Sequence, residues 1–206
     1  MSLDKFKLAV LVSGRGSNLQ AIIDSIEQNE LNVHLSAVLS DSEDALALKR
    51  AEKHGIETFF INPATYHNRK AFDKAMINRL RAMSIDLICL AGYMRILGKE
   101  FIQTFSGKII NIHPSLLPAF PGLNAQKQAI EYGVKFSGCT AHFVDEKVDS
   151  GPIILQTAVP VYDHDNEESL SQRILEQEHH IYPKAIKLIA ENKLTLNNRT
   201  VTHKKP

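Results

Sequence analysis

The sequence predicts an α/β fold: a single domain with a mostly parallel, twisted sheet and helices on both faces. Two observations support this class. Extended apolar runs alternate with amphipathic runs of helical period, which is the order of a parallel sheet with crossover helices. The run Asp86–Leu90 is a continuous apolar strand, as burial on both faces requires. Such sheets bind ligands beyond the carboxyl ends of their strands, so the polar loops there are the first candidates for a site.

Each element is predicted from its hydrophobic periodicity and from the glycine, proline and polar residues that bound it. The first helix, for example, places Leu19, Ile22, Ile23 and Ile26 on one face. The predicted strands are Lys7–Val12, Asn32–Leu39, Thr58–Ile61, Asp86–Leu90, Lys108–Ile112, Ser137–Phe143 and Ile153–Val159. The predicted helices are Asn18–Asn29, Glu43–His54, Asn68–Met83, Ala125–Tyr132 and Glu167–Glu191, the last with an interruption at Pro183 left open. Leu194–Val201 is either an edge strand or a tail.

The composition is that of an ordinary globular domain, with 44% hydrophobic and 23% charged residues in 206. A net charge of +1 gives no support for nucleic acid or an anionic membrane as a partner, and we expect neither. Cys89 and Cys139 stand in apolar contexts without paired spacing, so we expect two buried free thiols and a cytoplasmic location. No HExxH or CxxC pattern occurs, so no metal site is expected. We expect a monomer or weak homodimer.

A glycine-containing loop, "SGRGSN", joins the first strand to the first helix. The N–H groups at a helix start favour an anion, and Ser17 and Asn18 add a hydroxyl and an amide. Ser17 with Gln20 also fits a capping box, which needs no ligand, so both interpretations stay open. The loop does not fit a dinucleotide fingerprint, because Leu19 replaces the third glycine and no acidic residue follows the second strand at the expected place. A small phosphomonoester suits it better.

A second polar cluster is expected where the strand Lys108–Ile112 ends. Side chains alternate along a strand, so Asn111 and His113 share one face, and Pro114 then turns the chain away. Asp149 lies in a later turn-rich connection; it is either an ordinary turn former or a carboxylate that orients His113 and favours its charged form. His142 is a second candidate partner, though a satisfied sheet histidine is the simpler interpretation.

Four segments together carry a resemblance to a known family: "SGRGSNLQAI", "LAGYMRIL", "NIHPSLLPAFPG" and "GCTAHFVDEKVDSGPIILQ". They closely resemble the folate-dependent formyltransferase family, in particular its phosphoribosylglycinamide (glycinamide ribonucleotide) branch. The resemblance covers about Lys7 to Asn192. It implies a Rossmann-like fold and transfer of a formyl group from 10-formyltetrahydrofolate, the co-substrate, to the amine of glycinamide ribonucleotide in de novo purine biosynthesis.

The resemblance also implies site residues, position by position. Its catalytic residues are Asn111, His113 and Asp149. Its substrate-phosphate residues are Gly16, Ser17 and Asn18. Its folate contacts are Arg69, Met94, Arg95, Ile96, Leu97, Asn111 and the loop that ends at Asp149. Glu178 is its substrate-binding carboxylate, and periodicity places Glu178 with Ile174 and Ile181 on a face towards the sheet. Asn124 and Gln126 depart from the family, which often has histidines there.

The implied chemistry is direct transfer, with Asn111 and His113 stabilising a tetrahedral oxyanion and Asp149 supporting His113. One domain is expected over 1–206, with a phosphate-substrate half at about 1–100, a folate and catalytic half at about 85–192, and a tail at 193–206.

Two alternatives remain: a formyltetrahydrofolate hydrolase, and a non-catalytic phosphometabolite-binding module that would leave the three catalytic residues without a role. Formylation of methionyl-tRNA would need a further domain and a basic surface.

Overall fold

A computed structural model describes residues 5–204, so the extreme ends of the predicted domain, 1–4 and 205–206, lie outside the described residues. The α/β class with a mostly parallel sheet flanked by helices is confirmed. The chain divides into two compact units between Ile110 and Asn111. This boundary lies inside a strand.

The first unit contains four parallel strands. They are β1 (Lys7–Val12), β2 (His34–Ser40), β3 (Thr58–Phe60) and β4 (Leu87–Leu90). Their order is β3-β2-β1-β4. β2 and β3 therefore lie on one side of β1, and β4 lies on its other side. Residues 8–12 of β1 are all buried, as expected for a central strand covered on both faces. The carboxyl ends of β1, β2 and β4 therefore meet at one edge of this sheet.

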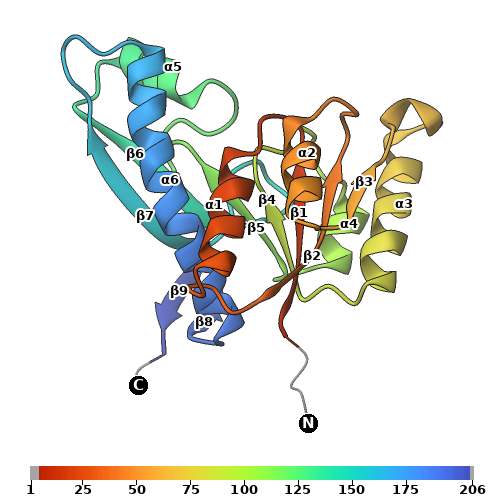
Figure 1. Cartoon of the computed structure of the whole chain (residues 1–206). Helices are drawn as coiled ribbons and strands as arrows, with labels where there is room; N and C mark the ends of the chain where they lie inside the picture. The colour runs from red at the N-terminus through yellow and green to blue at the C-terminus, as the bar shows by residue number, and fades with distance from the viewer. Residues whose placement is uncertain (1–4, 205–206) are drawn as a thin grey trace. The chain divides into compact units, whose positions relative to one another are not determined.

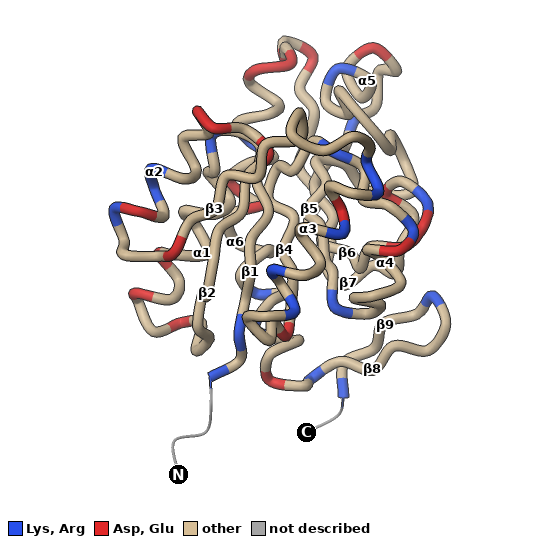
Figure 2. Tube along the Cα trace, turned by 90° about the vertical axis from the view of Figure 1, so that its right-hand side faces the viewer, with Lys and Arg blue, Asp and Glu red and all other residues tan. Residues whose placement is uncertain are grey.

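Helices cover both faces of that sheet. They are α1 (Ser17–Glu27), α2 (Leu46–Lys53), α3 (Arg69–Ala82) and α4 (Lys99–Thr104). Figure 2 shows α1 and α2 on one side of the strands and α3 and α4 on the other. Right-handed crossovers require this change of side when the strand order reverses. The sequence missed α4 and the short 3₁₀ turn Pro63–Thr65, because each is only a few residues long.

The second unit begins within β5 (Ile109–His113). It continues through α5 (Ala125–Tyr132), β6 (Phe136–Phe143), β7 (Ile153–Pro160), α6 (Glu167–Ala190), β8 (Leu194–Asn197) and β9 (Thr200–His203). β6 and β7 pair antiparallel, and α6 lies against both (Figure 1). Residues 194–203 form an antiparallel hairpin whose β9 pairs with β7, so most of the predicted tail belongs to the sheet.

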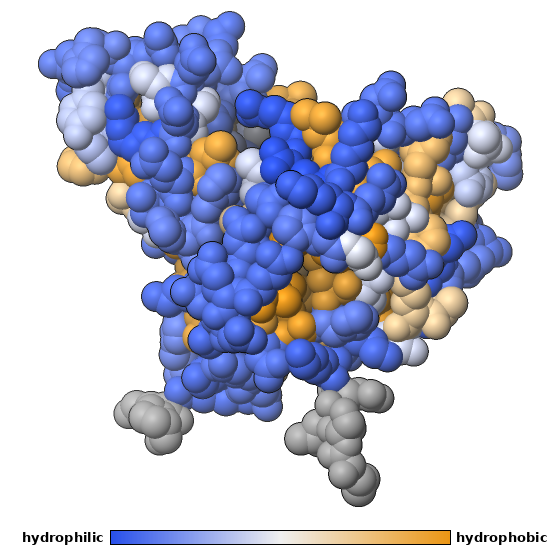
Figure 3. All heavy atoms as spheres, in the orientation of Figure 1, coloured by the Kyte–Doolittle hydropathy of each residue, from blue (hydrophilic) through white to orange (hydrophobic). Residues whose placement is uncertain are grey.

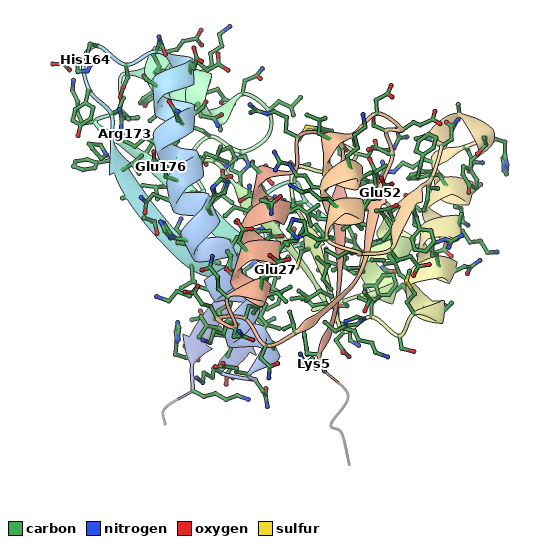
Figure 4. The ribbon with its side chains drawn as sticks, viewed as in Figure 1. Lys5, Glu27, Glu52, His164, Arg173 and Glu176 are labelled. Carbon is green, nitrogen blue, oxygen red and sulfur yellow. The ribbon has the colours of Figure 1, made fainter. Side chains whose placement is uncertain are left out.

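Helix α6 runs without interruption through Pro183. Proline removes one N–H from the helix, but Tyr182, Pro183 and Ile186 are all buried here, and that packing holds the helix together. Its start is fixed by a capping box between Asn166 and Ser169. Near that start lie the labelled Arg173 and His164 (Figure 4).

The surface agrees with the predicted globular composition. Figure 3 shows mostly hydrophilic residues on the face drawn, and Figure 2 shows both signs of charge interspersed along the trace. Cys89 and Cys139 are buried and form no disulfide, as predicted. Within residues 5–204, no helix is long and apolar enough to cross a membrane.

Candidate functional site

The glycine loop (residues 13–18) places Gly16 directly before α1. Gly16 has a φ of 72°, in the left-handed region, and a Cβ on it would lie 2.6 Å from the Cβ of Ala47. Both facts require glycine at this position. The predicted capping box is wrong: Gly16 is the cap residue, no side chain caps the helix, and the Gln20 side chain donates to Asp24. The capping-box explanation of Ser17 is therefore removed.

Contacts with α2 hold the glycine loop in place. The backbone N–H of Ala47 donates to the Gly14 carbonyl (3.1 Å). Arg50 donates to the Arg15 carbonyl (2.9 Å) and to the side chain of Gln20 (3.1 Å). With its carbonyls facing α2, the loop presents the first N–H groups of α1, which have no acceptor within the helix.

Ser13 links this loop to two other strand ends. Its backbone N–H donates to the Gly92 carbonyl (3.1 Å), and its hydroxyl donates to Asp41 Oδ1 (2.6 Å). The same hydroxyl accepts the backbone N–H of Met94 (2.9 Å). Asp41 follows β2 directly, so the expectation that no acidic residue stands after the second strand is wrong. The strand ends one residue later than predicted, at Ser40, which places Asp41 at its carboxyl end.

The segment 94–97, which the resemblance implies for folate, follows β4. Met94 and Ile96 are exposed apolar side chains, whereas Leu97 is buried. Arg95 lies 5.1 Å from the Phe72 ring centroid on α3, and Asp73 accepts the Gly98 N–H at 2.9 Å.

Arg69, the other predicted folate cation, lies one turn from Asp73 on α3 (Nε to Oδ2, 3.8 Å). Burial raises the pKa of Asp73, although the Gly98 N–H, Arg69 and Arg95 oppose that rise. Two arginines therefore stand near two exposed apolar side chains, a combination suited to an aromatic ligand that carries carboxylates.

In the second unit, His113 is buried at the end of β5. Its Nε2 lies 2.8 Å from the carbonyl oxygen of Phe120, which can only accept, so Nε2 carries a proton. Its Nδ1 lies 3.3 Å from Asp149 Oδ2. Both ring nitrogens thus face oxygen atoms that can accept a hydrogen bond. The predicted contact between His113 and Asp149 is confirmed.

Asp149 adopts a φ of 47°, which aspartate tolerates better than most residues. Its Oδ2 also accepts the Gly122 N–H (2.8 Å), which ties the proline-rich turn to the carboxylate. The following residue is held from the hairpin, since Arg199 donates to the Ser150 carbonyl at 2.6 Å. The segment predicted as a tail thus supports the loop that carries Asp149.

Asn111 completes the group that we call the Asp149 cluster (Asn111, His113, His142 and Asp149). Its Nδ2 lies 3.4 Å from Asp149 Oδ1 and 3.3 Å from His142 Nε2. Both distances are longer than those of a typical N–H hydrogen bond, so each contact is a weak one.

His142 is almost fully buried in β6, and its Nδ1 lies 2.8 Å from the Phe143 carbonyl. Burial lowers the pKa of His142, with the positive form of His113 adding to the effect and the Phe143 carbonyl and Asp149 opposing it. The neutral ring then donates from Nδ1 to Phe143 and keeps a lone pair on Nε2 for Asn111. His142 is therefore both a satisfied sheet histidine and a member of the cluster.

Glu178 is buried on α6, so the predicted inward orientation is confirmed. Burial, together with the charge of Glu178, raises the pKa of Cys139 to about 12, so this thiol stays protonated at neutral pH. Within residues 5–204, no group of three His, Cys, Asp or Glu side chains could hold a metal ion.

The structure thus brings the three predicted catalytic residues together in the second unit. The predicted phosphate residues and the folate residues at positions 69 and 94–97 lie in the first unit, whereas Asn111 and the loop that ends at Asp149 lie in the second. Sequence reasoning missed Asp41 and Asp73 and undervalued His142. A signal existed for Asp41, which directly follows a strand end; none existed for Asp73, whose partner lies in an irregular loop.

Comparison with known proteins agrees with the geometry. The formyl transferase family matches residues 6–186. The phosphoribosylglycinamide formyltransferase of Bacillus subtilis (strain 168) is 46% identical, with 94% of this chain and 97% of that protein covered. The crystal structure of glycinamide ribonucleotide transformylase 1 from Symbiobacterium toebii superposes with a TM-score of 0.96 at 50% identity, covering 98% of this chain and 95% of that one.

Longer relatives also contain the matched region. The trifunctional purine biosynthetic protein adenosine-3 of Bos taurus is 49% identical over 192 residues, which cover 93% of this chain and 19% of that protein. The chain spans about a fifth of the length of that relative.

Proposed function

The chain belongs to the formyl transferase family, and from that premise we propose that it transfers the formyl group of 10-formyltetrahydrofolate to the amine of glycinamide ribonucleotide, in purine biosynthesis. The observation that carries the proposal is the Asp149 cluster, in which an amide, an imidazole and a carboxylate converge at a strand end. The names of the similar proteins support the acceptor.

The reaction needs a stabilised oxyanion. When the amine nitrogen attacks the formyl carbon, the carbonyl oxygen becomes negative and a tetrahedral intermediate forms. In our proposal Asn111 Nδ2 and His113 Nε2 donate to that oxygen, which takes the place now held by the Phe120 carbonyl. Phe120 has a φ of 51°, unusual for an aromatic residue, so the turn that carries this carbonyl holds backbone strain that a shift can relieve.

The reaction also needs proton movement. The attacking amine loses a proton, and the folate nitrogen gains one as its bond to the formyl carbon breaks. His113 is placed to serve as the general acid and shuttle, directly or through a water molecule. Asp149 orients the imidazole through the 3.3 Å contact. The protonated Cys139 thiol argues for direct transfer without a thioester.

The remaining predicted residues bind the substrates. Gly16, Ser17 and Asn18 would hold the phosphate at the N-terminus of α1. Arg69 and Arg95 would pair with folate carboxylates, and Met94, Ile96 and Leu97 would contact its ring. Glu178 would bind a polar group of glycinamide ribonucleotide.

The test follows the loss of 10-formyltetrahydrofolate by absorbance, with and without glycinamide ribonucleotide. Turnover only with the amine supports the proposal. Turnover without it would show the hydrolase, and no turnover would show the binding module.

Calorimetry with glycinamide ribonucleotide and its dephosphorylated analogue tests the phosphate residues separately. We expect the phosphorylated compound to bind far more tightly, because its anion meets free N–H groups at a helix start. Equal affinities would remove the phosphate role of Gly16, Ser17 and Asn18.

A further inference from the structure

One hydroxyl group joins the two binding segments of the first unit. Ser13 begins the glycine loop, and its Oγ accepts the backbone N–H of Met94, the first residue of the segment 94–97. Asp41 accepts the proton of that hydroxyl at 2.6 Å. A serine side chain therefore lies between the residues assigned to the substrate phosphate and those assigned to folate.

The direction of these bonds is fixed by chemistry. An ionised carboxylate only accepts, so the hydroxyl proton must point to Asp41. A lone pair of Ser13 Oγ is then left for Met94, and each bond polarises and strengthens the other. Asp41 thus sets the orientation of Ser13, and Ser13 sets the position of Met94.

The segment 94–97 is also anchored at its other end. The N–H of Gly98 donates to Asp73, which lies on α3. Two backbone N–H groups, at Met94 and Gly98, thus bracket the exposed side chains between them. The two anchors differ in one respect: only Ser13 is part of the glycine loop.

We propose that Ser13, oriented by Asp41, is a positioning residue that couples the binding of the two substrates. This inference rests on the proposed function, because it assigns one ligand to each segment. A ligand that orders either segment orders Ser13 too, so the second ligand finds its segment already in place. The two ligands should therefore strengthen each other's binding.

Calorimetry measures this coupling without turnover. The affinity for glycinamide ribonucleotide is determined alone and with saturating tetrahydrofolate, which has no formyl group to transfer. We expect the folate to tighten binding at least about five-fold in the wild type, within the usual range of such coupling. In Ser13→Ala the ratio of the two affinities, with and without tetrahydrofolate, should fall to nearly one. The backbone bond from Ser13 to Gly92 remains in this variant and preserves the strand end.

Three further variants sharpen the test. Ser13→Thr keeps a hydroxyl, and Asp41→Asn keeps an acceptor for it, so both should retain most of the coupling. Asp41→Ala leaves the Ser13 hydroxyl without its acceptor and should abolish the coupling. This variant still tests the proposal if Ser13→Ala does not fold. Asp73→Ala should weaken tetrahydrofolate binding but keep the coupling ratio, because its anchor is separate from the glycine loop.

The outcomes separate two failures. Wild-type coupling in both Ser13→Ala and Asp41→Ala, or no coupling in the wild type, would overturn the inference while leaving the proposed function intact. A wild-type protein that binds neither ligand would overturn the proposed function itself.

Discussion

The glycine loop of the first unit is formed mainly by backbone groups, whereas the Asp149 cluster of the second unit is formed by side chains. The loop relies on backbone: Gly16 permits a left-handed turn, α2 holds the loop carbonyls, and the helix start supplies N–H groups. The cluster relies on side chains, since Asn111, His113, His142 and Asp149 orient one another. A backbone site tolerates many side-chain changes but not a change of backbone, whereas a side-chain site should fail at each member.

The largest effect is expected in the cluster. Asn111→Ala removes a proposed oxyanion donor and should lower the single-turnover rate by about 10²–10³-fold. Asp149→Asn keeps the shape but loses the charge opposite His113, and it should also cause a large loss. Affinity for glycinamide ribonucleotide and thermal unfolding serve as controls. If Asn111→Ala kept more than half of the wild-type rate, its assigned role would be wrong.

Gly16→Ala tests the backbone requirement of the loop. The left-handed conformation should cost about 1–2 kcal/mol of stability, and the contact with Ala47 adds to it. The affinity for glycinamide ribonucleotide should also fall. Calorimetry measures the affinity, and thermal unfolding measures the stability. Adding Ala47→Gly relieves the Cβ–Cβ contact and should recover only part of the loss, since the φ requirement remains. Wild-type stability and affinity in Gly16→Ala would contradict this account.

The cluster should also respond to pH through His142. Burial lowers the pKa of His142 below its usual 6.5, so the folded state binds fewer protons than the unfolded state at acid pH. Stability from this group is present above about pH 6.5 and falls as the pH drops towards the folded pKa. His142→Gln should reduce the loss of thermal stability between pH 7.5 and 5. An unchanged pH dependence of the unfolding temperature would show that His142 is not the group responsible.

The smallest effect is expected from Ser17→Ala. The variant removes a hydroxyl but leaves every backbone N–H of the loop, so glycinamide ribonucleotide should bind only a few-fold more weakly, about the contribution of one hydrogen bond. A loss as large as that of Gly16→Ala would show that side chains, not backbone, dominate this site.

The sequence was informative where local pattern decides structure. The alternation of strands and helices, the shared face of Asn111 and His113, and the inward direction of Glu178 all follow from periodicity. Leu194–Val201 is left open by the sequence as an edge strand or a tail, because the pairing of β9 with β7 joins residues far apart in the chain. The capping box predicted for Ser17 and Gln20 is wrong for a local reason: the helix begins one residue earlier than predicted, so Gly16 and not Ser17 is the cap residue.

The contacts that order the sites were the least predictable. Ser13 with Asp41, and Asp73 with Gly98, join residues that are far apart in sequence and carry no spacing signature. Asp149 was assigned through the family resemblance, whereas its residue type and turn context alone also fitted an ordinary turn former.

The central claim is that the two regions divide binding and chemistry, and His113→Gln tests it most directly. Removing the imidazole should lower the single-turnover rate of formyl transfer by at least about 10²-fold, because a proposed oxyanion donor and proton shuttle are lost together. The calorimetric affinity for glycinamide ribonucleotide should stay within a few-fold of the wild type. A rate above half of the wild-type value in folded His113→Gln, or a loss confined to binding, would contradict the account.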